Sequence, residues 1–118
     1  MMREVVFYRD DKNKIPVQNF LDSLAPKQAQ RVAWVLELIE ELEKIPKQYF
    51  KKLINTDDIW EIRIQAGNNT FRILSFFDET KLIVAAHGFA KKSRKVPRKE
   101  IIIAEKRKSA YFRRKHSE

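Results

Sequence analysis

The sequence predicts an α+β fold in which helices pack on an antiparallel β-sheet. β-branched and aromatic residues form one run near the N-terminus and a group of runs between residues 59 and 89. Segments whose apolar residues recur at helical spacing lie between the first run and this group, and another such segment follows the group. Such grouping is typical of a sheet with helices on one face. We therefore expect a single domain over residues 1–118, with the other face of the sheet open to a ligand.

The N-terminal half contains one strand and a pair of helices. "REVVFY" reads as a strand that ends at the polar turn "RDDKNK". Pro16 suits the first position of a short helix, which ends before Pro26. A longer helix is expected from about Pro26 to Lys44, because apolar residues recur at helical spacing: Ala29, Val32, Leu36, Ile39 and Leu42.

The C-terminal half contains a strand meander and a last helix. "IWEIRIQ", "TFRILSFF" and "KLIVAAHGF" are separated by "AGNN" and "DET", which are turns of hairpin length. Pro97 then opens a helix over "EIIIAEKRKSAYFRRK". The basic end of this helix, residues 109–118, is expected to fray.

Composition excludes several classes of function. The 118 residues include no Cys and two His, which removes disulfides, thiol nucleophiles and Cys-ligated zinc. We expect no metal site. The N-terminus is charged where a signal peptide is apolar, and no apolar run approaches the roughly 18 residues that span a bilayer. The expected location is the cytoplasm, without a membrane partner.

The positive charge is concentrated near the C-terminus. The net charge is +9, yet residues 1–89 hold 13 basic and 13 acidic side chains, whereas residues 90–118 hold 12 basic and 3 acidic ones. A local excess of this kind predicts a polyanionic partner such as a nucleic acid. The alternative is a solvated tail that only improves solubility.

Strand alternation places charged residues on the face away from the predicted core. Trp60, Ile62 and Ile64 point one way, so Glu61 and Arg63 point the other. Arg72, on the next strand, is expected on this same polar face, close to Arg63. Like charges on neighbouring strands repel, which indicates an anion between them. The alternative is that Glu61 neutralises one arginine in a surface ion pair.

The motifs "IWEIR", "FRIL" and "GFAKK" followed by Pro97 resemble, in this order, the HigB branch of the RelE/ParE toxin–antitoxin superfamily, a phage-derived host-killing toxin branch. The resemblance extends over nearly the whole chain and implies the order β-α-α-β-β-β-α. It also implies a ribosome-dependent mRNA endoribonuclease that needs no cofactor or metal, contacts ribosomal RNA and is inhibited by a cognate helix-turn-helix antitoxin. The alternatives are a ParE-type toxin that binds a protein such as gyrase, and a plain RNA-binding module.

By this resemblance, Arg63 and Arg72 bracket the scissile phosphate, and Lys91 or Lys92 completes the cluster. The proton-transfer residue stays open between His87, Glu61 and a lysine of lowered pKa, for which Lys92 is favoured. Some relatives use a tyrosine near the last helix, where this chain has Glu100 and Ile101. Further RNA contacts are expected from basic residues before the second strand and around the last turn: Lys51, Lys52, Arg94, Lys95, Arg98 and Lys99.

Overall fold

The computed structural model describes residues 1–117. The helices are α1 (Pro16–Asp22), α2 (Pro26–Glu41) and α3 (Arg98–His116). The strands are β1 (Glu4–Phe7), β2 (Phe50–Lys52), β3 (Trp60–Ala66), β4 (Asn69–Asp78) and β5 (Leu82–Ala90). This order confirms the predicted α+β layout and adds one short strand, β2.

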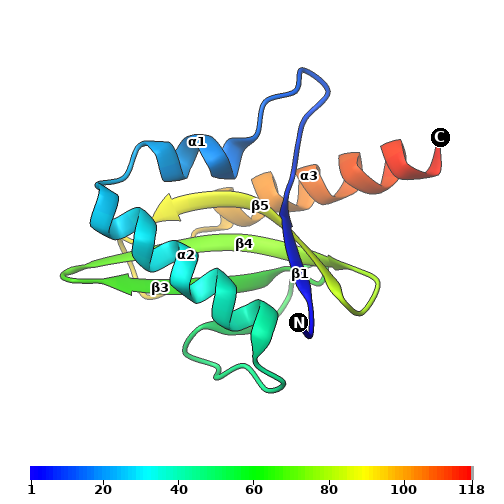
Figure 1. Ribbon diagram of the computed structural model, residues 1–118. Coiled ribbons are helices and arrows are strands. Elements are labelled where there is room, and N and C mark those ends of the chain that lie inside the picture. The colour runs from blue at the N-terminus through cyan, green and yellow to red at the C-terminus, as the bar shows by residue number, and fades with distance from the viewer. Residues whose placement is uncertain (118) are drawn as a thin grey trace.

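The strands form a single mixed sheet in the order β1-β5-β4-β3-β2 (Figure 1). The meander of β3, β4 and β5 is antiparallel, as predicted. In contrast, β1 pairs with β5 in parallel, so the sheet is not antiparallel throughout. The helix pair between β1 and the meander crosses the face of the sheet, which allows β1 to lie beside β5 in the same direction. β2 has only three residues, too few to reveal an alternating pattern.

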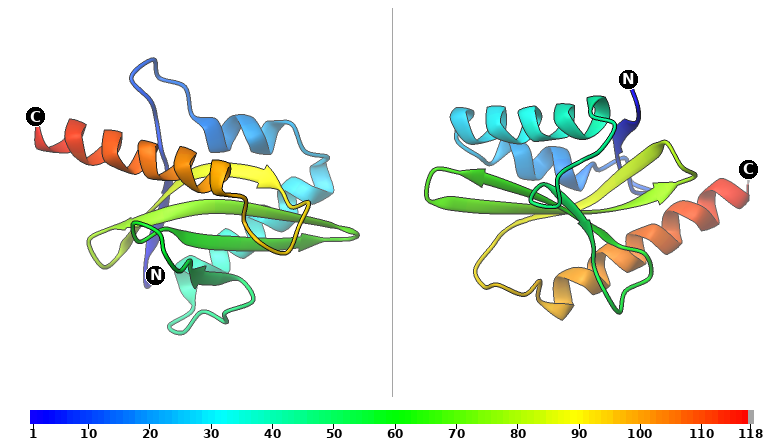
Figure 2. Two further views of the ribbon diagram at one scale, coloured as in Figure 1. Left: turned by 180° about the vertical axis from the view of Figure 1, so that it is seen from behind. Right: turned by 90° about the horizontal axis from the view of Figure 1, so that it is seen from below.

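Helices cover both faces of the sheet. Figure 2 shows α1 and α2 on one side and α3 on the other. The α1/α2 side buries the predicted apolar set, including Ile62, Ile64, Phe71 and Ile73. The α3 side has its own buried cluster: Tyr8, Ile59, Leu74, Phe76, Val84, Ala86 and Ala104. The expectation of an open second face is therefore wrong, because the apolar side chains of β4 and β5 on that face need a cover, and α3 supplies it.

Arg3 explains where α2 ends. Its guanidinium donates to the carbonyl of Ile39 (2.8 Å) in the last turn of the helix and to those of Leu42 (2.7 Å) and Glu43 (2.7 Å) just beyond it. The last carbonyls of a helix have no partner within it, and a cation there also complements the helix dipole. The helix consequently ends at Glu41 rather than continuing to Lys44 as expected.

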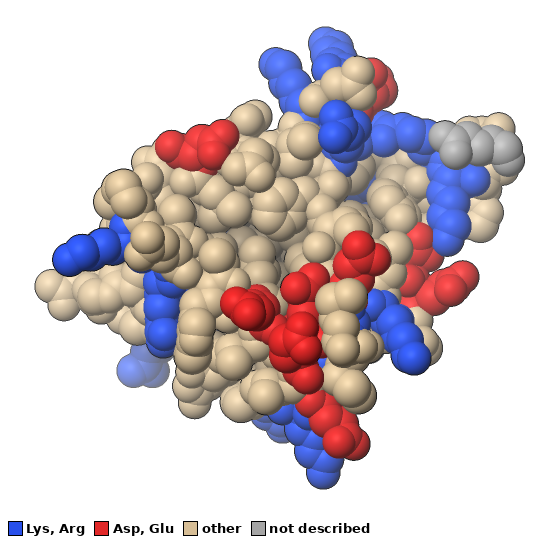
Figure 3. All heavy atoms as spheres, viewed as in Figure 1, with Lys and Arg blue, Asp and Glu red and all other residues tan. Residues whose placement is uncertain are grey.

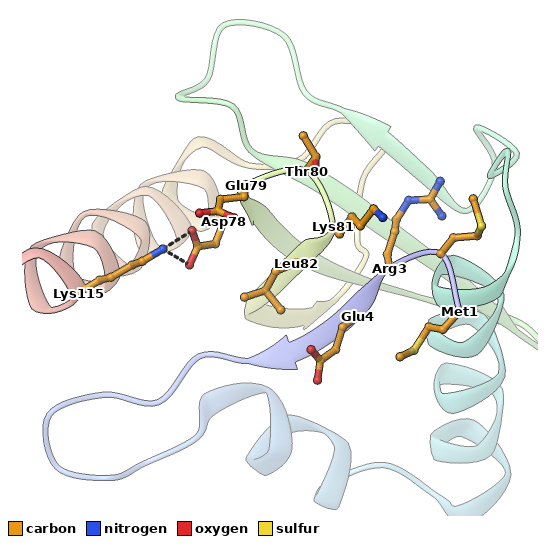
Figure 4. A pocket seen from close by; sticks show the side chains of 10 residues that line it. Met1, Arg3, Glu4, Asp78, Glu79, Thr80, Lys81, Leu82 and Lys115 are labelled. Atoms are coloured by element: carbon orange, nitrogen blue, oxygen red, sulfur yellow. Dashed lines mark hydrogen bonds and ion pairs between the residues drawn. The ribbon is translucent and has the colours of Figure 1, made fainter.

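The basic end of α3 is held against the β4–β5 hairpin. The Tyr111 hydroxyl donates to Asp78 Oδ2 at 2.6 Å. On the other side, Lys115 Nζ lies 2.7 Å from Asp78 Oδ1 (Figure 4). Asp78 is buried, and hydrogen bonds from Lys115 and Tyr111 lower its pKa. Burial and the bond to Asp78 raise the pKa of Tyr111 to about 12. Residues 109–116 are thus helical and anchored rather than frayed, while residue 118 lies outside the described residues.

This anchor predicts a pH-dependent contribution to stability. Because the folded-state pKa of Asp78 is lowered, its stabilisation is complete above the unfolded value of 3.8 and is lost as the pH falls through the folded value. Asp78→Asn should reduce the free energy of unfolding by about 1–3 kcal/mol at neutral pH. The difference from wild type should shrink in acid, measured by urea unfolding at both pH values. Glu79→Gln, at the exposed neighbouring position, is the control; a difference independent of pH would contradict this role.

Candidate functional site

The predicted arginine pair is present on the α3 face of the sheet. In the β3–β4 register Arg63 lies directly opposite Arg72, and Glu61 lies opposite Leu74. Glu61, Arg63, Arg72 and Leu74 therefore point to the same face of the sheet, as strand alternation predicted. Lys51 is paired with Glu61 and belongs to this face, whereas Lys52 is paired with Trp60 and belongs to the other.

Glu61 and Arg72 form a buried ion pair. Arg72 Nε lies 2.7 Å from Glu61 Oε2, and each side chain is 3% exposed. The two atoms are close enough for an ion pair but lack the angle of a hydrogen bond. Glu61 therefore neutralises Arg72, which was the alternative interpretation of the sequence. The ion pair lies in the interior, however, and not on the surface as that alternative expected. No ion pair to Arg63 forms within residues 1–117, so its charge is left uncompensated.

Arg72 also holds the segment between β5 and α3, residues 91–97, which we call the basic loop. Its Nη2 donates to the carbonyl of Arg94 at 2.7 Å and lies 3.4 Å from that of Ser93. Its Nη1 is buried and has no hydrogen-bond partner within residues 1–117. Burial lowers the pKa of Arg72, and Glu61 opposes that shift. This guanidinium therefore keeps one unused donor, which could donate one further hydrogen bond to an oxygen atom.

Lys91 completes the positive cluster. Its side chain is half-buried at the start of the basic loop. Partial burial lowers its pKa, and the neighbouring charges of Arg63 and Arg72 lower it further. The cluster has a net charge of about +2, because it contains the positive side chains of Arg63, Arg72 and Lys91 and the negative side chain of Glu61. The sequence left this place in the cluster open between Lys91 and Lys92 and favoured Lys92 for proton transfer. The structure places Lys92 at an exposed position on the loop.

A basic pocket of about 460 Å³ opens beside the cluster. It lies between the end of β5, the basic loop and the first turn of α3. Its lining contains five positive side chains and one negative one: Arg72, Lys91, Lys92, Lys95 and Lys99 with Glu100. Of the other predicted RNA contacts, Arg94 and Arg98 are exposed nearby, and Lys51 is exposed on the edge strand. Lys52 instead pairs with Asp58 at 2.6 Å, on the opposite face of the sheet.

His87 is held between two charged residues of α3. Its Nε2 lies 3.0 Å from Glu100 Oε1, and its Nδ1 lies 3.4 Å from Nη1 of Arg107. The same Arg107 nitrogen donates to the carbonyl of Ala86 at 2.7 Å. The ring is also stacked on Phe89. Sequence reasoning did not identify Arg107 or this role of Glu100, although their spacing of seven residues places both on one helix face.

Other parts of the surface have different chemistry. Figure 3 shows acidic side chains gathered on the face that carries α1 and α2, with basic ones toward its edges. A second pocket, of about 430 Å³, lies beside the β4–β5 hairpin (Figure 4). It mixes acidic with basic side chains, so it has no comparable excess of charge: Glu4, Asp78 and Glu79 with Arg3, Lys81 and Lys115.

Within residues 1–117, no three His, Asp or Glu side chains come together as metal ligands.

Residues 19–109 match the family described as Phage derived protein Gp49-like (DUF891). The chain belongs to this family. Gp49-like proteins are a RelE/HigB-type toxin family, which is consistent with the toxin of a toxin–antitoxin system and implies a cognate antitoxin as partner. No curated protein matches the chain. Within residues 1–117, the helices are all too short or too polar to cross a membrane.

Proposed function

We propose that this Gp49-like protein is a HigB-like toxin that cuts mRNA on the ribosome, in the cytoplasm. The observation that carries the proposal is the cluster of Arg63, Arg72 and Lys91, which concentrates positive charge on a rigid sheet beside a basic pocket. RNA cleavage by the neighbouring 2′-hydroxyl needs such charge, because negative charge builds up on the phosphate oxygens in the transition state.

In this mechanism Arg63 binds the scissile phosphate, since its guanidinium is not neutralised by a carboxylate. Arg72 supplies the unused Nη1 donor, and Glu61 fixes the orientation of Arg72 through the buried ion pair. Arginine suits this task because its planar fork can hold two phosphate oxygens. Lys91 stands close enough to both arginines for their charges to lower its pKa, and it protonates the 5′-oxygen that leaves.

The remaining basic residues guide the RNA. Lys92, Lys95 and Lys99 surround the pocket, and Arg94 and Arg98 extend the positive surface along the loop and the start of α3. We assign them contacts with the phosphate backbone of mRNA and ribosomal RNA, which position the strand without reading bases. The antitoxin, with acidic residues directed at this surface, would compete with RNA for it.

Ribosome-dependent cleavage is the direct test of this proposal. The protein is added to a reconstituted translation reaction, and new mRNA 5′ ends are mapped with and without ribosomes. Cuts should require ribosomes and should fall about 10²–10³-fold in Arg63→Ala, the usual loss when one electrostatic donor is removed. Arg31→Ala is the matched control, because Arg31 lies on α2, on the opposite face of the sheet.

Two outcomes would count against the nuclease. If folded wild-type protein made no cuts, a toxin that binds a protein target, or an RNA-binding module without chemistry, would be favoured. If Arg31→Ala reduced cleavage as much as Arg63→Ala, total charge rather than the arginine cluster would control activity.

A further inference from the structure

Glu100 connects the basic pocket with His87. It lies in the first turn of α3, and its carboxylate is both part of the pocket lining and 3.0 Å from His87 Nε2. It is the single acidic residue among the side chains that line this pocket. Within residues 1–117, only Oε1 of this carboxylate makes a hydrogen bond, so Oε2 is left without a hydrogen-bond partner.

Arg107 determines which nitrogen of His87 carries the proton. An arginine side chain can only donate, so Nδ1, at 3.4 Å from Arg107 Nη1, is the acceptor. The hydrogen of the neutral ring is then on Nε2 and is donated to Glu100. Both ring nitrogens are therefore occupied, and His87 has none left for a substrate. His87 is also absent from the pocket lining.

We propose that Glu100 is the general base of the reaction and that His87 is a positioning residue that holds it; this rests on the proposed RNA cleavage. Glu100 Oε2 takes the proton from the RNA 2′-hydroxyl. The 2′-oxygen then forms a bond to phosphorus, and the bond from phosphorus to the 5′-oxygen breaks with its electron pair. The 5′-oxygen takes a proton from Lys91, which leaves a 2′,3′-cyclic phosphate and a 5′-hydroxyl.

Glu61, the other carboxylate near the cluster, is less suited to this role. Its side chain is 3% exposed and is already paired with Arg72. Glu100, in contrast, faces a pocket large enough for a nucleotide and is surrounded by cations that attract the phosphate. The charged and titratable groups facing it come from β4, β5, the basic loop and α3: Arg72, His87, Lys91, Lys92, Lys95 and Lys99.

Glu100→Gln tests the proposal with little change of shape. The amide oxygen can still accept the His87 hydrogen bond, but the side chain can no longer take a proton. We expect single-turnover cleavage of ribosome-bound mRNA to fall about 10²–10⁴-fold, the usual contribution of general acid–base catalysis. Binding of a short RNA oligonucleotide should be unchanged or tighter, because a negative charge is removed.

Glu105→Gln on the same helix is the matched control, since the Glu105 carboxylate accepts a hydrogen bond from the Asp57 backbone amide and is not part of the pocket lining. It should cleave as wild type does. If wild type cleaves and Glu100→Gln cleaves equally well, the role of Glu100 is refuted while the nuclease stands. If wild type itself does not cleave, both proposals fall.

The tautomer of His87 provides a readout of its positioning role that is independent of activity. The chain has two His residues, so their ring signals are simple to assign by long-range proton–nitrogen NMR. The neutral His87 ring should carry its hydrogen on Nε2. A hydrogen on Nδ1 would show that the ring does not hold Glu100 as described, and would overturn this part of the proposal.

Discussion

Replacing Glu61 with alanine should destabilise the fold by about 3–5 kcal/mol, the usual effect of removing one partner of a buried ion pair. Arg72 would then keep a buried charge without a counterion, because Glu61 is its only carboxylate partner within residues 1–117. The effect should appear as a lower midpoint in urea unfolding. The pair is 3% exposed on both sides, so solvent cannot replace the lost partner as it does on the surface.

A double variant separates stability from activity. Glu61→Leu with Arg72→Met replaces the pair by apolar side chains of similar size, which in other proteins is neutral or stabilising. We expect this variant to recover most of the stability lost in Glu61→Ala and to remain unable to cut mRNA. Recovery of cleavage would show that Arg72 only supports the fold, and a loss below about 1 kcal/mol in Glu61→Ala would show that the pair is not buried in solution.

The contrast between Arg63 and Arg72 shows what strand alternation can and cannot predict. Alternation placed both on one face, and the β3–β4 register confirms it. It could not distinguish the partly buried position of Arg63 from the buried one of Arg72, because burial of Arg72 depends on the basic loop folding back over it. The contacts to Ser93 and Arg94 are made by backbone carbonyls, which have no signature in the side-chain sequence.

The same limit applies to the helix that covers the second face. The apolar residues of α3 were visible in the sequence, but its basic end, residues 109–118, was expected to fray. Asp78, on a different element, holds Tyr111 and Lys115 in place. Likewise, His87 was identified as a candidate while its partners on α3 were not. Long-range partners of this kind are set by how elements pack, and local periodicity does not specify that packing.

Lys91→Met should reduce cleavage of ribosome-bound mRNA by about 10²–10⁴-fold if Lys91 protonates the leaving oxygen. Partial burial and the charges of Arg63 and Arg72 lower the pKa of Lys91, which makes its ammonium a stronger acid at neutral pH. The wild-type rate should therefore fall as the pH rises through this lowered pKa and the proton is lost. The variant should lack that alkaline decline, measured as the single-turnover rate against pH.

Lys91→Arg distinguishes an acid from a simple positive charge. Arginine keeps the charge, but it does not release its proton at these pH values. RNA binding should therefore be retained in Lys91→Arg while cleavage stays as low as in Lys91→Met. Full activity in Lys91→Arg would mean that Lys91 acts only through its charge. Lys81→Met, at an exposed position beside the β4–β5 turn, controls for the loss of one lysine; because it lies far from the basic pocket, it should leave both the rate and its pH dependence unchanged.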